Sequence, residues 1–271
     1  MGLSVNTNLG ALVALQNLNA TNKKLDRTQL NITTGLKVNG PKDDASTFAI
    51  AQSMRGQVAG ITAIKGALST GESFVNVAIT AGQSVADLLT EMKSKVVQAN
   101  QAGLDSNSRS ALQNDFDALR NQISTITATA EFNGINLVKS GATATSVLST
   151  IAGSTISVSA QTLDTTTLAI NTSTLSTSSG AAAALTAIDS AITTVSSKLA
   201  SLGSVAKRIE VQAEFTNKLQ DILKAGIGNL VDADLAEESA MLQALQIKQQ
   251  LGVQSLSIAN SGPQSILALF R

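Results

Sequence analysis

Histidine, cysteine, tryptophan and tyrosine are all absent from this chain of 271 residues. Without imidazoles and thiols, histidine bases, cysteine nucleophiles and most zinc sites are excluded. Only 2% of the residues are aromatic, although 43% are hydrophobic. Cores of leucine, isoleucine, valine and alanine suit long helix-to-helix packing better than compact enzyme pockets. We therefore expect no enzymatic activity, no cofactor and no metal site.

An excess of charge of either sign is also missing, because 19 basic residues balance 19 acidic ones. No basic stripe is present, which argues against a nucleic-acid partner. No run of about 18 apolar residues could span a membrane, and polar interruptions disfavour a membrane-surface helix. The first basic residue is Lys23, and the N-terminal segment lacks the pattern of a cleaved secretory signal. If the chain is exported, we expect a route that reads no cleaved signal.

Two fragments of catalytic or metal-binding motifs occur without their partners. Ser204 and Lys207 have the S-x-x-K spacing of penicillin-recognising enzymes, but the companion motifs are missing. The acids Asp232, Asp234, Glu237 and Glu238 lack the glycine and remaining ligands of a calcium loop. We interpret these acids as the favourable negative charges at the start of a helix.

The two ends of the chain resemble each other and differ from the middle. Residues 1–136 and 184–271 carry apolar residues at helical spacing, whereas 21 of the 41 residues in 140–180 are serine or threonine. Two helical arms around a small polar segment predict a hairpin whose termini meet. Such a chain has more apolar stripe than it can bury alone, which favours self-assembly.

The N-terminal arm predicts several helices. A helix over about 6–33 places Leu18, Leu25 and Ile32 seven residues apart, as in a coiled coil. An ordinary amphipathic helix is the alternative, but about 27 residues would extend roughly 40 Å, beyond the usual globular length. After a break at residues 35–41, Asp43 or Asp44 caps a helix beginning over 45–59, and further helices are expected over about 76–101 and 107–130.

The polar segment carries strand signals. Ile156, Val158 and Ala160 alternate with hydroxyl residues after a possible turn at 152–154, and Leu168 and Ile170 form a weaker alternation. A short β hairpin is therefore expected, with a disordered linker as the alternative.

The C-terminal arm predicts two more helices. One runs over about 181–222 and stops at the glycines of 226–229. The last covers about 234–259, ends at Gly262 and Pro263, and is followed by an apolar tip.

Short motifs at both ends resemble those of bacterial flagellins. In the N-terminal arm they are Val5-Asn6-Thr7-Asn8, Asn17-Leu18-Asn19, Thr34-Gly35-Leu36-Lys37-Val38-Asn39, Lys42-Asp43-Asp44-Ala45 and Phe132-Asn133-Gly134. In the C-terminal arm they are Asp232-Ala233-Asp234, Gln249-Gln250, Ala259-Asn260 and Ile266-Leu267-Ala268-Leu269-Phe270-Arg271. Each is weak alone, but their order and position make the resemblance specific over about 1–139 and 182–271.

The resemblance implies a mostly α fold, a long antiparallel helical hairpin or bundle with a terminal coiled coil and a small β hairpin. Residues 1–33 and 237–271 would form the filament-core coiled coil, 34–46 and 226–236 the connecting segments, and 47–225 the surrounding bundle, with its β region near 134–180. Large outer domains look absent, as in short alphaproteobacterial flagellins.

The function implied is a structural subunit of the flagellar filament. Its partners would be further copies of itself, other flagellins, an export chaperone, and cap and junction proteins; no nucleic acid and no membrane would be bound. It would be exported unfolded and located in the extracellular filament. A hook–filament junction or minor flagellin-like accessory protein is the alternative. The expected polymerisation interface comprises Leu9, Leu12, Leu18, Leu25, Ile32, Leu235, Leu242, Leu245, Val253, Leu256, Ile266, Leu267, Leu269 and Phe270.

The resemblance also implies a stretch through which a Toll-like receptor of animal hosts senses flagellins. Leu89 agrees with strongly sensed members, but Glu91 and Lys93 stand where those members have arginine. Ser94 replaces an acid, and Lys95 places a charge where an apolar contact is expected. We therefore expect poor sensing by the receptor. Serines and threonines within 140–179 are candidates for O-linked sugars.

Overall fold

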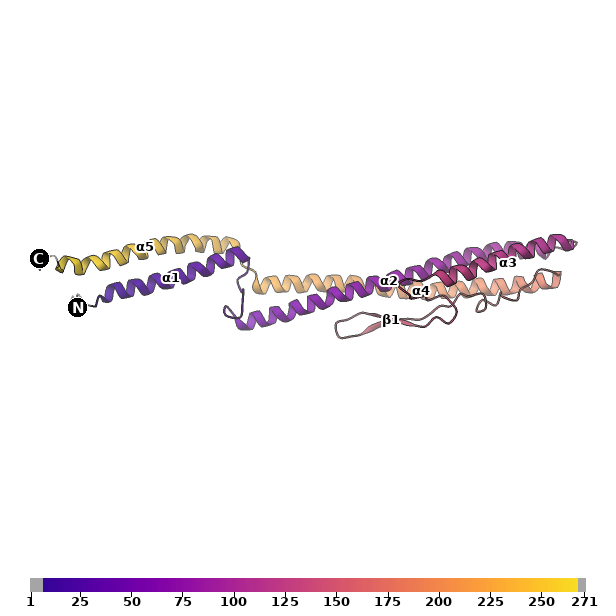
Figure 1. Ribbon diagram of the computed structural model, residues 1–271, viewed down its shortest axis with the longest axis horizontal. Coiled ribbons are helices and arrows are strands. Elements are labelled where there is room, and N and C mark those ends of the chain that lie inside the picture. Colours follow the sequence, from indigo (N-terminus) through magenta and orange to yellow (C-terminus); the bar gives the residue numbers. More distant parts are fainter. Residues whose placement is uncertain (1–6, 268–271) are drawn as a thin grey trace. The chain divides into compact units, whose positions relative to one another are not determined.

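The structure is a computed structural model that describes residues 7–267 (Figure 1). The predicted mostly α class is confirmed by five helices and one two-stranded antiparallel sheet within the described residues. The chain divides into two compact units. Residues 1–56 and 222–271 form the terminal unit, and residues 57–221 form the central unit. Their elements in chain order are α1 (Leu9–Thr34), α2 (Ala45–Ala99), α3 (Ser106–Thr129), β1 (Thr145–Leu148), β2 (Thr155–Val158), α4 (Ser178–Val231) and α5 (Leu235–Leu267).

Helix α1 has a defined cap at each end. The side chain of Asn8 accepts a hydrogen bond from the Ala11 N–H at its start. Gly35 ends the helix in the left-handed conformation, with φ +69°, and its N–H donates to the Asn31 carbonyl at 2.8 Å. A residue with a Cβ is strained in that conformation, which explains a glycine at this position.

Helix α2 is one continuous helix of 55 residues. Asp44 caps it by accepting from the N–H groups of Ser46 and Thr47, and the hydrogen bonds from Thr47 hold the pKa of the Asp44 carboxyl below its usual value. The prediction of separate helices over 45–59 and 76–101 is wrong. Buried residues recur at intervals of three and four along 61–99, and their packing outweighs the roughly 1 kcal/mol that each interior glycine costs.

Helix α4 likewise continues past its predicted break. It runs to Val231 through Gly226 and Gly228, and only residues 232–234 separate it from α5. A Cβ on Gly226 would lie 2.9 Å from the Met54 Cε. The glycine therefore makes room for a neighbouring helix instead of ending its own. Helix α5 also passes the predicted stop at Gly262 and Pro263, because an interior proline removes one backbone hydrogen bond without by itself ending a helix.

The core of the central unit lies between α2, α3 and α4. Lys65 of α2 donates to Gln220 of α4, and Lys93 of α2 forms an ion pair with Asp189 of α4, so these two helices are antiparallel. Helix α3 contributes Phe116 and Ile123, both fully buried. Its start is capped by Asp105.

The buried Arg109 joins the end of α2 to the start of α3. Its guanidinium donates to the carbonyls of Ala99 and Gln101, at the end of α2 and just beyond it. A buried charge is costly unless it is hydrogen-bonded, and these carbonyls would otherwise lack helical donors. One side chain therefore satisfies both requirements at the turn.

The predicted β hairpin is present with the expected strand at Ile156 and Val158, but its partner strand lies at 145–148 and not at the weaker alternation of Leu168 and Ile170. β1 pairs with β2 in the register Thr145↔Val158 and Leu148↔Thr155. Leu168 and Ile170 lie outside any strand, in a turn-rich loop that buries both. That loop is held against α3, because Gln113 accepts from the Leu175 N–H at 2.5 Å.

Three glycines on α2 seat the hairpin and the chain that follows it. Gly60, Gly71 and Gly82 are 11 residues apart, about three helical turns, and so share one face. A Cβ at these positions would meet Ile151 at 3.4 Å, Val147 at 2.6 Å, and Leu199 at 2.7 Å together with Leu163 at 3.3 Å. Glycine at Gly71 therefore allows β1 to approach the helix backbone closely.

Gly71→Ala tests this close approach. The added methyl group would overlap Val147, and we expect the free energy of unfolding to fall by about 1–3 kcal/mol. Gly66→Ala is the matched control, since a Cβ there meets nothing within 4 Å on the same helix. It should raise stability by about 0.4–1 kcal/mol. Urea unfolding followed by circular dichroism measures both; equal effects would contradict the packing of β1 on α2.

Candidate functional site

Helices α1 and α5 form an antiparallel pair in the terminal unit (Figure 1). Asn31 near the end of α1 meets Glu238 near the start of α5, and Asn22 meets Gln249 further along. One turn beyond that contact, Leu18 lies over Gly252, where a Cβ would be 3.2 Å from the Leu18 Cδ1. The first and the last of the described helices, far apart in the sequence, are thus paired within one chain.

The contact between α1 and α5 follows intervals of three and four residues. This spacing is that of a coiled coil. Only Leu25 and Leu245 are buried leucines within it, at 8% and 4% exposure. We define the seam by its buried and half-buried members, which are Ala11, Ala14, Leu18, Thr21, Asn22, Leu25, Thr28, Asn31 and Ile32 on α1 and Glu238, Leu242, Leu245, Gln249, Gly252, Leu256 and Ala259 on α5.

Amide side chains form hydrogen bonds between the two helices. The Gln249 Nε2 donates to the Asn22 Oδ1 at 2.9 Å, and the Asn31 Nδ2 donates to the Glu238 Oε1 at 2.8 Å. The Asn8 Nδ2 donates to the Ala259 carbonyl at 2.7 Å. A slip by one turn would break all three, and a polar group left unpaired in a packed interface costs about 1–3 kcal/mol. These pairs therefore specify one register.

The predicted interface residues fall into three groups. Leu18, Leu25, Ile32, Leu242, Leu245 and Leu256 lie in the seam. Leu9, Leu12, Leu235 and Val253 are at least half exposed and lie outside it. The side chains of Ile266 and Leu267, and all of Leu269 and Phe270, lie outside what the structure describes.

Sequence reasoning missed the small and polar members of the seam. Ala11, Thr21 and Thr28 extend the interval of Leu18 and Leu25 in both directions, and Gly252 does the same on α5. Only their spacing of three and four residues marks these positions in the sequence. A search for leucine and isoleucine could not detect it.

The two connecting segments are paired with each other. Leu36 and Asp232 form an isolated antiparallel bridge, the Lys37 N–H donates to the Val231 carbonyl at 2.7 Å, and the Ala233 N–H donates to the Gly35 carbonyl at 2.9 Å. A small apolar cluster of Val38, Ala51 and Val231 lies beside them. Of the segment 226–236 that was predicted to connect the parts, residues 226–231 belong to α4 and Leu235 begins α5.

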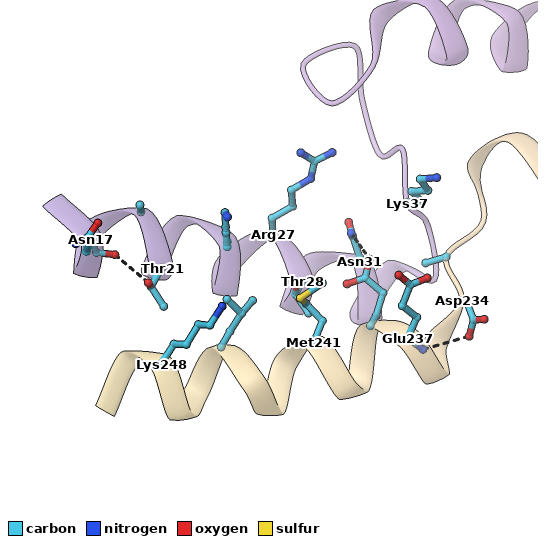
Figure 2. Close-up of a pocket in the computed structure, with 15 residues that line it drawn as sticks. Asn17, Thr21, Arg27, Thr28, Asn31, Lys37, Asp234, Glu237, Met241 and Lys248 are labelled. Atoms are coloured by element: carbon cyan, nitrogen blue, oxygen red, sulfur yellow. Dashed lines mark hydrogen bonds between the residues drawn. The ribbon is translucent and has the colours of Figure 1, made fainter. Parts of the chain in front are cut away.

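A groove of about 710 Å³ runs along the pair near these connections. Figure 2 shows its lining residues, contributed by α1, by α5 and by the segment that carries Lys37. Charges of both signs gather here, with Lys24 and Arg27 on α1 and Glu237 and Glu238 on α5. Asp234 caps α5 by accepting from the Ala236 N–H at 2.8 Å, as expected for acids at a helix start.

Within residues 7–267, no group of three or more acidic side chains is placed to hold a metal ion. None of the helices in this described range is both long and apolar enough to cross a membrane.

The stretch matched to receptor recognition lies on α2 in the central unit. Leu89 is fully buried, so its side chain is not on the free surface. Lys93 is paired with Asp189 and Lys95 with Asp115, each at 2.7 Å, and the Asp115 hydrogen bond raises the pKa of Lys95. Glu91 and Ser94 are exposed.

The hydroxyl residues of 140–179 differ in exposure. Ser146 and Ser157 face each other across the hairpin, and both are exposed. Ser149 is buried, and its hydroxyl donates to the Ser154 carbonyl at 2.9 Å. The exposed face of the hairpin is therefore the accessible part of this range.

Comparison with known proteins matches both arms of the chain to one family. The bacterial flagellin N-terminal helical region matches residues 5–143, and the bacterial flagellin C-terminal helical region matches residues 185–270. The flagellins FljM and FljK of Caulobacter vibrioides are each 45% identical over 269 residues, which cover 99% of this chain and 98% of the relative. A flagellin of Brucella melitensis is 34% identical over 282 residues, with 99% of each chain covered.

Solved structures show the same fold at lower identity. A putative flagellar hook-associated protein from Vibrio parahaemolyticus has a TM-score of 0.58 and 14% identity, with 70% of this chain and 100% of that chain covered. A Bacillus cereus flagellin has a TM-score of 0.50 and 21% identity, with 54% and 86% covered. The full-length identity to flagellins, together with both matched helical regions, establishes that this chain belongs to the bacterial flagellins, the subunits of the flagellar filament.

Proposed function

We propose that the α1–α5 pair carries the surface through which this flagellin subunit adds to its filament. The observation that supports this most directly is that α1 and α5 leave large apolar side chains exposed outside the seam between them. Monomeric proteins rarely expose extended apolar patches, so such a surface indicates a binding site. The residues are Leu9, Leu12, Val13, Leu15, Leu30, Leu235, Met241, Ile247, Leu251, Val253 and Ile258.

The expected interface residues then have two roles. Leu25 and Leu245 hold α1 to α5 within one subunit. Leu9, Leu12 and Val253 face outward and contact neighbouring subunits. An interface between different patches of identical subunits does not close on itself, and it therefore generates a helical polymer. In this proposal 1–33 with 237–271 form the filament core, and 47–225 form the surrounding bundle.

The remaining parts of the proposal come from family membership. The subunit is exported unfolded, without a cleaved signal, and assembles outside the cell. An export chaperone, cap and junction proteins and other flagellins are its partners, and it has no catalytic activity. A junction or accessory protein is not favoured, because the relatives that match almost the whole chain at 45% identity are flagellins.

Electron microscopy of the purified protein, salted out of solution, tests the function. Long filaments of uniform diameter are the expected result. Only short or irregular aggregates under all salt conditions would contradict a filament subunit.

Leu245→Asp tests whether the seam supports assembly. The leucine alone contributes about 2–5 kcal/mol when buried, and the new charge would lie in the seam without a partner. We expect filament formation to be lost. Each 1.4 kcal/mol of lost stabilisation raises the protein concentration needed for assembly about tenfold. Gln246→Asp adds the same charge at the exposed neighbouring position and should leave assembly intact. Sedimentation separates filament from monomer; equal loss in both variants would argue against the seam.

Receptor-reporter cells dosed with purified monomer test the receptor prediction. Glu91 places a negative charge where strongly sensed flagellins have an arginine. Lys93 and Lys95 are already paired with acids of this chain. At about 2 kcal/mol or more for each lost anchor, we expect potency lower by orders of magnitude than that of a strongly sensed flagellin. Comparable potency would refute the prediction.

The intact mass of protein from native filaments tests modification and export together. Sugars on exposed hydroxyls such as Ser146 and Ser157 would raise the mass above the 27.7 kDa of the bare chain. A mass equal to that of the bare chain would reject the sugars. A mass lowered by an N-terminal segment would reject export without cleavage.

A further inference from the structure

The chain contains two asparagine–glycine pairs, Asn39-Gly40 and Asn133-Gly134. Asparagine is one of the chemically labile side chains of proteins, because the main-chain nitrogen of the next residue can attack its side-chain amide. A following glycine has no Cβ, so it neither shields that nitrogen nor restricts the backbone rotation that the attack requires. These two pairs are therefore the most reactive asparagine positions in the sequence, and their surroundings in the structure differ.

The pair Asn39-Gly40 lies in the terminal unit and is fixed by hydrogen bonds. The Gly40 N–H, whose nitrogen would have to attack, donates to the Asp43 Oδ2 at 3.2 Å, and the Asn39 N–H donates to the same oxygen at 3.1 Å. The Asn39 side-chain amide donates to the Leu36 carbonyl at 3.0 Å. Asp43 is itself paired with Arg27 at 3.6 Å. Both reacting groups of this pair are therefore held in bonds that the reaction would have to break.

The pair Asn133-Gly134 forms an exposed turn of the central unit, between Phe132 and Ile135. Both of its residues have positive φ, 51° and 78°, a conformation in which turns favour Asn-Gly. Two main-chain hydrogen bonds between Phe132 and Ile135, at 2.9 and 3.0 Å, close the turn. Within residues 7–267, neither the Asn133 side-chain amide nor the Gly134 N–H has a hydrogen-bond partner. The attack therefore needs only the opening of a turn whose two hydrogen bonds are each of modest net worth.

Asn136 separates this turn from the rest of the central unit. Its buried side chain donates to the Thr127 carbonyl of α3 at 2.9 Å and accepts from the N–H groups of Val138 and Lys139, both at 2.9 Å. The chain that follows the turn is thus fixed to the end of α3 without any contribution from Asn133. The turn can therefore open while the central unit stays folded.

We propose that Asn133 is a site of spontaneous deamidation in the folded subunit, whereas Asn39 is protected by Asp43. The Gly134 nitrogen gives its proton to hydroxide and bonds to the Asn133 Cγ, and the side-chain nitrogen takes a proton from water and leaves as ammonia. Water then opens the resulting cyclic imide at either carbonyl. The products are aspartate and isoaspartate, in which the main chain runs through the former side chain. This reaction is independent of the proposed assembly function.

The products differ from the original subunit in charge and in the geometry of the turn. Each adds a negative charge to a chain whose formal net charge is zero. Isoaspartate also lengthens the main chain between Phe132 and Ile135 and so disrupts the bridge that closes the turn. The isoaspartyl carboxyl is the group that a protein-isoaspartate methyltransferase accepts. Because Asn136 holds the following chain, we expect the change to stay local and the helix content to be unaltered.

Incubation of the purified full-length protein at mildly alkaline pH, below its unfolding temperature, tests the proposal. Peptide mass spectrometry measures the conversion of amide to acid at each asparagine, and labelling by an isoaspartyl methyltransferase measures the isoaspartyl product. We expect Asn133 to react about tenfold or more faster than Asn39, because a hydrogen bond to a carboxylate is one of the stronger kind. The rate should rise with pH, since the deprotonated nitrogen attacks. In urea, which removes the hydrogen bonds of both pairs, the two rates should become similar.

Two neighbouring acids provide matched variants. Asp43→Ala removes the acceptor of the Gly40 N–H and should accelerate the reaction at Asn39 about tenfold while leaving that at Asn133 unchanged. Asp44→Ala removes the adjacent carboxylate, which caps α2 and does not bond to Gly40, and should leave both rates unchanged. Asn133→Asp supplies the charge of the aspartyl product and marks its position in ion-exchange chromatography.

A native protein in which Asn39 reacts as fast as Asn133, or in which Asn133 stays intact, would overturn the proposal. Earlier reaction at an asparagine outside the two pairs would overturn it as well. Protection by Asp43 would be refuted if Asp43→Ala left the rate at Asn39 unchanged or if Asp44→Ala raised it equally. Should Asp43→Ala fail to fold, the comparison of native with urea-unfolded wild type decides, because a difference that persisted in urea would owe nothing to the fold.

Discussion

Packing between long antiparallel helices at alternating intervals of three and four residues is the interaction on which both units depend. On α2 the fully buried Leu68, Leu89 and Val96 lie on such a line, and on α4 Ile188 and Val195 do. This interval keeps one stripe facing a partner over many turns, because it slightly underwinds the helix. Only 2% of the residues of the chain are aromatic, so few side chains are large enough to fill a wide gap between helices. Small residues along the stripes let the helix backbones approach closely and so narrow that gap. The scarcity of aromatic rings and the length of the helices therefore belong together, because long helices that pack closely can bury enough small apolar side chains to form a core.

The same packing is used differently in the two units. In the central unit most of the contact is apolar, with buried positions recurring on α2 from Ile61 to Ala99, and Gln220 is a buried polar exception. In the α1–α5 pair, Asn22, Asn31 and Gln249 occupy or border the contact and bond across it. Amides at such positions reduce stability but specify register. The pair is therefore accurately aligned and only modestly stabilised by itself, which suits a surface completed by neighbouring subunits.

The sequence predicted the helical class, the hairpin strand at Ile156 and Val158, and the coiled-coil interval of Leu18 and Leu25. Glycines misled the prediction of helix ends. The sequence around Gly226 predicts a helix break, but in the structure this glycine lies against Met54 of another helix, and the sequence of α4 alone does not reveal that contact. The seam of α1 and α5 was predicted only in part, because threonine, alanine and glycine carry no hydrophobic signal. β1 was missed because Thr145 and Ser146 resemble the hydroxyl-rich loop around them.

The cross-helix bonds of the terminal pair join residues 207 to 251 positions apart in the sequence. Contacts of such separation form late, since the intervening chain must be ordered or closed first. During synthesis α1 has no partner until residues beyond 234 exist, so almost the entire chain is made while its first helix is still unpaired. The N-terminal helix therefore stays without its partner α5 for most of the time that this chain is being synthesised. Because the two helices of one pair lie far apart in the sequence, chain order delays the pairing of α1 with α5 until synthesis has passed residue 234.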